Sequence, residues 1–270
     1  MGGAQRNERN KRQQAMASRS VAQARGTAGG DRKKTIGIVV AVVLVAAAVI
    51  GGVLWSNASK NATAGQTIDP GISKQLAAGV VEKRDGVVVT VGKPGAKASI
   101  DIYADFLCPI CGTFQKTYGT QIEDQVNSGA LQVKYHMVPL LNESSNPPGY
   151  SLDSANASLA AADAGKFTAF HDALFANQPE EGKRGFDKGQ LIALGQGLGI
   201  TDPKFTASIT SGTYDQQLDA EFAKTLKDDN LAQTFPDGRR SFGTPTVAVN
   251  GKSIQVQDPS WLQKLVAGQS

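Results

Sequence analysis

The chain is poor in cysteine and histidine. Only two of its 270 residues are cysteine and only two are histidine. Two cysteines cannot form a framework of disulfides that staples a fold. They also give no second cysteine pair to complete a zinc or copper site, and His136 and His171 are the only histidines available. We therefore expect neither a bound metal nor a cofactor.

The chain has no net positive charge outside its first residues. Residues 1–34 hold nine lysines and arginines and two acidic residues, a net charge of +7, so the remaining residues carry −3 of the overall +4. This segment is rich in Gln, Asn, Gly, Ser and Ala and has no apolar periodicity, which predicts a disordered basic tail on the cytoplasmic side. The main body gives no indication of nucleic-acid binding.

One long apolar run follows the tail. Residues 36–55 contain no charge, and a helix of about 20 residues spans roughly 30 Å, the hydrocarbon thickness of a bilayer. Basic residues precede the run and Trp55 ends it, as the positive-inside rule and the aromatic belt favour. We predict a single transmembrane helix over residues 35–55 that anchors the protein in the cell membrane. The alternatives are a signal peptide cleaved near Ala62-Thr63-Ala64 and a buried core helix.

Everything after Trp55 is then expected outside the cytoplasm, where disulfides form and persist. Residues 56–79 are polar, small and rich in turn formers, which predicts a linker. Strands are predicted over 86–91, 98–104 and 131–138, with a helix from Cys108-Pro109 to about Val126. This strand–helix–strand unit predicts two parallel strands with a right-handed crossover.

A helical block and a hairpin complete the chain. Three helices are expected, and their apolar residues are Leu159, Phe167, Phe170 and Leu174 in the first, Leu191, Ile192, Leu194 and Leu198 in the second, and Leu218, Phe222 and Leu226 in the third. Asn250-Gly251 between two β-branched runs is a strong hairpin signal. A short helix over 259–266 is predicted to follow, with Asp258 as its N-cap.

The two cysteines lie three residues apart in the run Cys108-Pro109-Ile110-Cys111, where a strand ends and a helix begins. The unpaired N–H groups and the dipole of that helix favour a negative charge, so Cys108 is expected to ionise readily. Pro109 fits the first helical turn. Cys111, one turn further on, is expected to be more buried and to resolve a mixed disulfide formed at Cys108. The alternatives are a metal half-site, two inert cysteines and a purely structural disulfide.

The order of elements, the CPIC motif and the later Gly243-Thr244-Pro245-Thr246 together resemble the DsbA-like thiol:disulfide oxidoreductases, in their membrane-anchored bacterial form. The resemblance implies an α/β thioredoxin fold over residues 80–268, with a central mixed sheet flanked by helices and a helical insertion at about 146–234. It also implies that Pro109 and Ile110 tune the redox pair, that Thr244-Pro245 is a cis bond beside the sulfurs, and that the backbone of Thr244 pairs with substrate.

Some residues depart from the wider thioredoxin pattern. Leu107 stands where thioredoxins have tryptophan, and Ile102 stands where they have a buried acid that aids proton transfer. That route is missing unless Asp105 or water takes its place, and Asp105 could instead cap the helix that follows.

The leading hypothesis is an oxidase of reduced, newly exported proteins, reoxidised by a membrane quinone-linked thiol oxidase that the resemblance implies. The alternatives are a reductase or isomerase kept reduced by a membrane electron donor, and a non-catalytic anchored protein that binds a metal or a peptide.

Overall fold

The structure, a computed structural model, describes residues 61–71, 75–235 and 237–268. The predicted basic tail and the predicted transmembrane helix over 35–55 lie outside the described residues. Within those ranges, no helix combines the length and the apolar character needed to cross a bilayer.

A six-stranded mixed sheet forms the centre of the fold, with the strand order β1-β2-β4-β3-β7-β8. β3 (Ala98–Ala104) and β4 (Leu131–Met137) are parallel and are joined by α3 (Pro109–Ser128), as the sequence predicts. The other pairs are antiparallel and involve β1 (Val81–Asp85), β2 (Val88–Gly92), β7 (Thr246–Val249) and β8 (Lys252–Ile254). Asn250 and Gly251 both have positive φ, as the tight hairpin turn requires.

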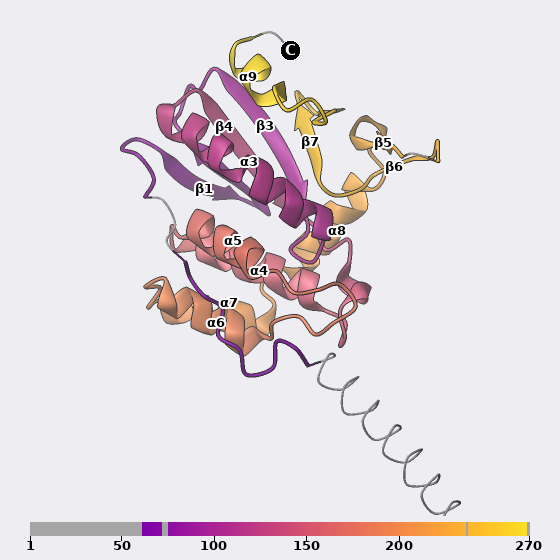
Figure 1. Cartoon of the computed structure of the whole chain (residues 1–270). Coiled ribbons are helices and arrows are strands. Elements are labelled where there is room, and N and C mark those ends of the chain that lie inside the picture. The colour runs from indigo at the N-terminus through magenta and orange to yellow at the C-terminus, as the bar shows by residue number, and fades with distance from the viewer. Residues whose placement is uncertain (1–60, 72–74, 236, 269–270) are drawn as a thin grey trace, which may run out of the picture. The chain divides into compact units, whose positions relative to one another are not determined.

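The helical block contains five helices, so the prediction of three is wrong. They are α4 (Tyr150–Asp163), α5 (Phe167–Ala176), α6 (Lys188–Gly197), α7 (Pro203–Ser211) and α8 (Asp215–Thr225), and we call them the helical subdomain. The chain breaks between α4 and α5 at Gly165, whose φ of 63° lies in the left-handed region. In Figure 1 the sheet and α3 occupy the upper half of the view, and α4 to α7 gather in the lower half.

Short elements complete the described chain. They are the 3₁₀ turns η1 (Asn142–Ser144) and η2 (Asp229–Leu231), the two-residue strands β5 (Gln233–Thr234) and β6 (Arg240–Ser241), and α9 (Trp261–Val266). The N-cap of α9 is Ser260, so the prediction of Asp258 is wrong. Asp258 instead accepts a hydrogen bond from the Ser260 backbone N–H and contacts Lys264 Nζ.

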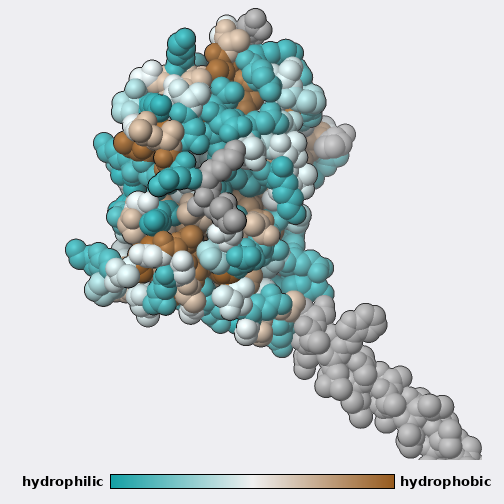
Figure 2. All heavy atoms as spheres, turned by 60° about the vertical axis from the view of Figure 1, so that its left-hand side comes forward, coloured by the Kyte–Doolittle hydropathy of each residue, from teal (hydrophilic) through white to brown (hydrophobic). Residues whose placement is uncertain are grey.

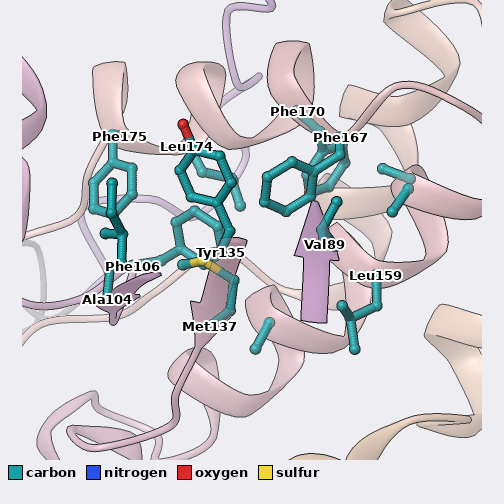
Figure 3. Packing of buried hydrophobic residues seen from close by; sticks show 14 of the residues in the cluster. Val89, Ala104, Phe106, Tyr135, Met137, Leu159, Phe167, Phe170, Leu174 and Phe175 are labelled. Carbon is teal, nitrogen blue, oxygen red and sulfur yellow. The ribbon is translucent and has the colours of Figure 1, made fainter. Parts of the chain in front are cut away.

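One hydrophobic core joins the sheet to the helical subdomain. Phe167 and Phe170 of α5 are fully buried, and the ring of Phe167 lies 5.1 Å from the ring of Tyr135 on β4. Figure 3 shows Phe167, Phe170, Leu174 and Phe175 gathered on one side of the strands, close to Val89, Tyr135 and Met137. The two parts of the fold therefore pack as one body.

Residues 61–71 also pack on the helical subdomain. Ile68 belongs to the core with 2% of its surface exposed. Thr63 Oγ1 donates to the Gly185 carbonyl at 2.7 Å, and Asn177 Nδ2 donates to the Asp69 carbonyl at 2.9 Å. The sequence predicts a linker over 56–79, but this part of it has fixed side-chain contacts.

The outer face of the described chain is largely polar. Figure 2 shows a mostly hydrophilic surface on which apolar residues form small, separate patches. The large hydrophobic side chains that stay exposed are Val81, Ile110 and Leu226. Ile110 is the one of the three that belongs to the CPIC motif.

The shared core leads to a prediction for Phe170, which is fully buried between α5 and its neighbours. Phe170→Ala should lower the free energy of unfolding by about 3–5 kcal/mol, because it removes a large buried ring and leaves a cavity. Leu226→Ala, at an exposed position, should change it by less than about 0.5 kcal/mol. Urea unfolding followed by circular dichroism measures both, and equal values for the two variants would contradict this packing.

Candidate active site

The CPIC motif lies where β3 leads into α3. The strand ends at Ala104, a turn runs from Asp105 to Cys108, and α3 begins at Pro109. Cys108 is the N-cap residue and has an extended backbone, with Pro109 in the first helical turn, where its missing N–H removes no hydrogen bond. The sequence predicts this placement of Cys108 at the positive end of the helix dipole, where a thiolate is favoured.

Both cysteines are free thiols and both are largely covered. Cys108 exposes 5% of its surface and Cys111 exposes 1%. The order of burial agrees with the prediction, although Cys108 is less accessible than the sequence suggests. Pro109 and Ile110 between them are exposed, so these two side chains form the outer edge of the site.

The two thiols differ strongly in acidity. The pKa of Cys108 is lowered to about 6, and the hydrogen bond from Cys111 is the largest cause. Burial opposes this shift, whereas hydrogen bonds from Thr244 and from the N–H groups of Cys111 and Ile110 add to it. Burial raises the pKa of Cys111 well above its ordinary value, and the neighbouring Cys108 raises it too. At neutral pH the reduced pair therefore holds one negative charge, on Cys108.

The loop before β7 closes over the same sulfur. The Thr244–Pro245 peptide is cis, as the resemblance implies. Cys108 Sγ donates a hydrogen bond to the Thr244 carbonyl at 3.4 Å. Gln233 holds this loop in place, because its Nε2 donates to the carbonyls of Gly243 and Pro245 at 3.0 and 2.9 Å.

Asp105 is a buried acid beside the pair, and it does not cap α3. Its Oδ1 accepts hydrogen bonds from the Leu107 N–H at 2.7 Å and from Ser151 Oγ at 2.8 Å, and its Oδ2 accepts one from the Leu141 N–H at 2.7 Å. Burial raises the pKa of Asp105 to about 6, although these three hydrogen bonds lower it. The expected alternative role as a helix cap is therefore wrong, because the carboxylate braces the turn itself.

Two side chains of the helical subdomain reach this turn without any signal in the sequence. Ser151 on α4 contacts the Asp105 carboxylate. Gln178, just after α5, donates through Nε2 to the carbonyls of Phe106 and Cys108 at 2.9 and 2.8 Å. A polar residue 46 or 70 positions away along the chain has no local pattern that would reveal such a contact.

The reactive groups of the site are the two thiols. Across the described ranges, no group of three or more His, Cys, Asp or Glu side chains is placed to hold a metal ion. His136 contacts Asp101, and His171 contacts Asp172. An acidic thiol beside a buried, weakly acidic one can cycle between dithiol and disulfide and can exchange with the thiols of another molecule.

Comparison with known proteins identifies the family. The family model described as "Thioredoxin" matches residues 84–267, and the chain belongs to this family. The reduced disulfide bond oxidoreductase DsbG of Mycobacterium tuberculosis is 33% identical, with a TM-score of 0.56 over 68% of this chain and 86% of that one. Reduced DsbA of the same organism is 30% identical, with a TM-score of 0.55 over 71% of this chain and 92% of that one.

A curated relative places the same kind of domain in a longer protein. Serine/threonine-protein kinase PknE of M. tuberculosis is 33% identical over 189 residues, which are 67% of this chain. The match spans 31% of the length of that relative. The described part of the present chain thus has the fold of DsbA-like thiol:disulfide oxidoreductases.

The acidity of Cys108 can be tested directly. In the reduced protein, the ultraviolet absorbance of the thiolate should appear with a midpoint near pH 6 and should be absent in Cys108→Ser. In Cys111→Ala the midpoint should move upward, because the hydrogen bond from Cys111 is the largest cause of the low pKa. A midpoint at the ordinary cysteine value of about 8.5 in the unmodified protein would contradict this geometry.

The contact between Ser151 and Asp105 predicts a pH-dependent loss of stability. The hydrogen bond from Ser151 lowers the pKa of Asp105, so Ser151→Ala should raise that pKa further. The variant should lose about 1.5–3 kcal/mol of unfolding free energy at about pH 8, where Asp105 is ionised, and less at about pH 5, where it is protonated.

The matched control is Ser154→Ala, on the same helix. Ser154 is equally buried, but its Oγ donates to the Tyr150 carbonyl, which does not titrate. Its loss of stability should be the same at both pH values, and urea unfolding measures each. A loss for Ser151→Ala that does not grow with pH would refute the bond to an ionised Asp105.

Proposed function

We propose that this protein is an extracytoplasmic thiol:disulfide oxidoreductase that oxidises the cysteines of exported proteins through Cys108 and Cys111. The observation that carries the proposal is the placement of two free thiols at the start of α3, with Cys108 Sγ 3.4 Å from the Thr244 carbonyl and Cys111 buried one turn further on. This placement lowers the pKa of Cys108 and raises that of Cys111. A thiol of low pKa leaves readily from a disulfide, and a stabilised thiolate makes the reduced state favourable, as an oxidant requires.

The reaction begins with the oxidised pair. A substrate thiolate attacks Cys108 Sγ, the Cys108–Cys111 bond breaks, and Cys111 leaves with the electron pair and takes up a proton. A second substrate thiolate then attacks the substrate sulfur of the mixed disulfide, and Cys108 leaves as a stable thiolate. The substrate loses two electrons and gains a disulfide, and the pair ends as one thiolate and one thiol.

The loop around Pro245 is the proposed place for the substrate chain. The Thr244 carbonyl lies 3.4 Å from Cys108 Sγ, so an extended peptide that pairs with the backbone of Thr244 brings its cysteine to that sulfur. Pro109 and Ile110 are exposed beside it and are proposed to tune the pair and to contact the substrate. Unfolded exported proteins fit this role, because their backbone is free to pair.

The membrane arrangement belongs to the same proposal. The apolar run over 36–55 anchors the chain in the bilayer with its N-terminus in the cytoplasm, and the basic residues before it set this orientation. A quinone-linked thiol oxidase in the membrane reoxidises the pair. DsbG and DsbA of M. tuberculosis, whose folds the described residues share, support the thiol–disulfide chemistry.

The reductase or isomerase remains the second candidate, because one observation favours it. A Cys108 pKa of about 6 is closer to that of thioredoxin, about 7, than to that of DsbA, about 3.5. The reduction potential of the pair separates the two functions. A value near −120 mV supports the oxidase, and a value near −270 mV supports the reductase.

Cysteine variants test whether the pair is catalytic at all. The full-length protein in detergent should catalyse oxidation of a reduced, unfolded protein in a glutathione buffer, and Cys108→Ser should reduce the rate to the uncatalysed background. Cys111→Ser should accumulate a mixed disulfide with the substrate, visible on a non-reducing gel, because Cys111 is no longer there to attack Cys108 Sγ and release a substrate whose second thiol reacts slowly. Rates in both variants equal to that of the unmodified protein would exclude a redox function and favour a non-catalytic binding protein.

A further inference from the structure

Gln178 lies outside the CPIC motif, and its side chain hydrogen-bonds to the backbone of Cys108. It lies in the loop after α5 and is half-buried. Its Nε2 has two acceptors, the carbonyl of Phe106 at 2.9 Å and that of Cys108 at 2.8 Å. Both carbonyls belong to the turn that presents Cys108 Sγ to the site.

Three further hydrogen bonds of this turn are local. The Cys108 N–H donates to the Asp105 carbonyl at 3.1 Å, and the Leu107 N–H donates to Asp105 Oδ1. The Cys108 carbonyl also accepts the first hydrogen bond of α3, from the Gly112 N–H at 3.1 Å. Gln178 therefore adds to the Ser151–Asp105 contact a second link between this turn and the helical subdomain, and this one holds the backbone of Cys108 itself.

The helix leaves room for Gln178 because residue 112 is glycine. A Cβ atom at Gly112 would lie 2.1 Å from Gln178 Oε1, far closer than two such atoms can approach. Glycine is unfavourable inside a helix compared with alanine. Here its lack of a side chain has a use, since it lets the amide of Gln178 reach the two carbonyls.

Aromatic packing holds the same region of α5 against the turn. The ring of Phe106 lies 5.0 Å from that of Phe175, three residues before Gln178. Figure 3 shows Phe106 and Phe175 side by side at the edge of the core. This packing holds the loop that carries Gln178 close to the turn independently of the hydrogen bonds that its amide makes.

We propose that Gln178 is a positioning residue for the redox pair, and that Gly112 is required for it to act. The proposal rests on the proposed thiol–disulfide function. By holding the carbonyls of Phe106 and Cys108, Gln178 keeps the first turn of α3 in the arrangement that aims the N–H groups of Ile110 and Cys111, and the Cys111 thiol, at Cys108 Sγ.

The two redox states depend on Gln178 to different degrees. In the disulfide form a covalent ring closes the turn between Cys108 and Cys111. In the dithiol form there is no covalent link between the sulfurs, and hydrogen bonds and packing hold Cys108 in the position where its thiolate is stabilised. Loss of Gln178 should therefore destabilise the reduced form more than the oxidised form.

The test is Gln178→Ala in the full-length protein in detergent, equilibrated with glutathione. The equilibrium between dithiol and disulfide should shift about fivefold toward the disulfide, which corresponds to a potential lower by about 20 mV. The midpoint of thiolate formation at Cys108 should move upward in the same variant.

Gly112→Ala gives an independent perturbation, because it displaces the amide without changing residue 178. It should shift the equilibrium in the same direction as Gln178→Ala. In the double variant it should add nothing, since there is then no amide to displace. An additive effect would mean that Gly112 acts by another route and would overturn the pairing.

Gln190→Ala is the matched control. The Nε2 of Gln190 also donates to two backbone carbonyls, those of Thr63 and Gln66, but away from the sulfurs. Its potential and thiolate midpoint should equal those of the unmodified protein, even where stability falls. Unchanged values in Gln178→Ala, or equal shifts in both glutamine variants, would overturn the proposal. If the unmodified protein oxidises the substrate no faster than Cys108→Ser does, the proposed function itself is refuted.

Discussion

The structure depends on one constraint, which is that hydrogen bonds from several elements fix the backbone turn between β3 and α3. A thiolate at a helix N-terminus is stabilised only if the N–H groups stay aimed at it. Within the turn, Asp105 fixes the backbone by accepting a hydrogen bond from the Leu107 N–H. The helical subdomain supplies the rest from outside, through Ser151 and Gln178. The subdomain thus supports the sulfur site and does more than cover it.

The same constraint separates the two cysteines. Cys108 lies at the end of the helix beside the Thr244 carbonyl, and Cys111 lies one turn inward with almost no exposed surface. Burial opposes ionisation at both, but only Cys108 gains enough hydrogen bonds to overcome it. Cys108 and Cys111 have identical side chains, so their different acidities come from their different positions on one helix.

The sequence predicts the parts of this fold that rest on local patterns. The strand–helix–strand unit around CPIC and the Asn250-Gly251 hairpin are present as expected. Strand β1 was not predicted, because Val81–Asp85 is a largely charged edge strand without apolar alternation. The separation of α4 from α5 was missed because their apolar residues keep a helical spacing across Gly165. In the site, the cysteines and Pro245 follow from motifs, whereas Gln178 and Gln233 act through contacts with residues outside their own segments.

The continuous core between the sheet and α5 has a consequence for how the proposed substrate would bind. Phe167 and Phe170 are fully buried in that core, so moving the two halves apart would expose large apolar rings to water. The surface around Cys108 is then preformed, and conformational adjustment falls to the incoming chain. A preformed site of this kind would distinguish between substrate segments by how flexible they are. In the proposed function, such a surface would take unfolded segments and would pass over cysteines already buried in a folded domain.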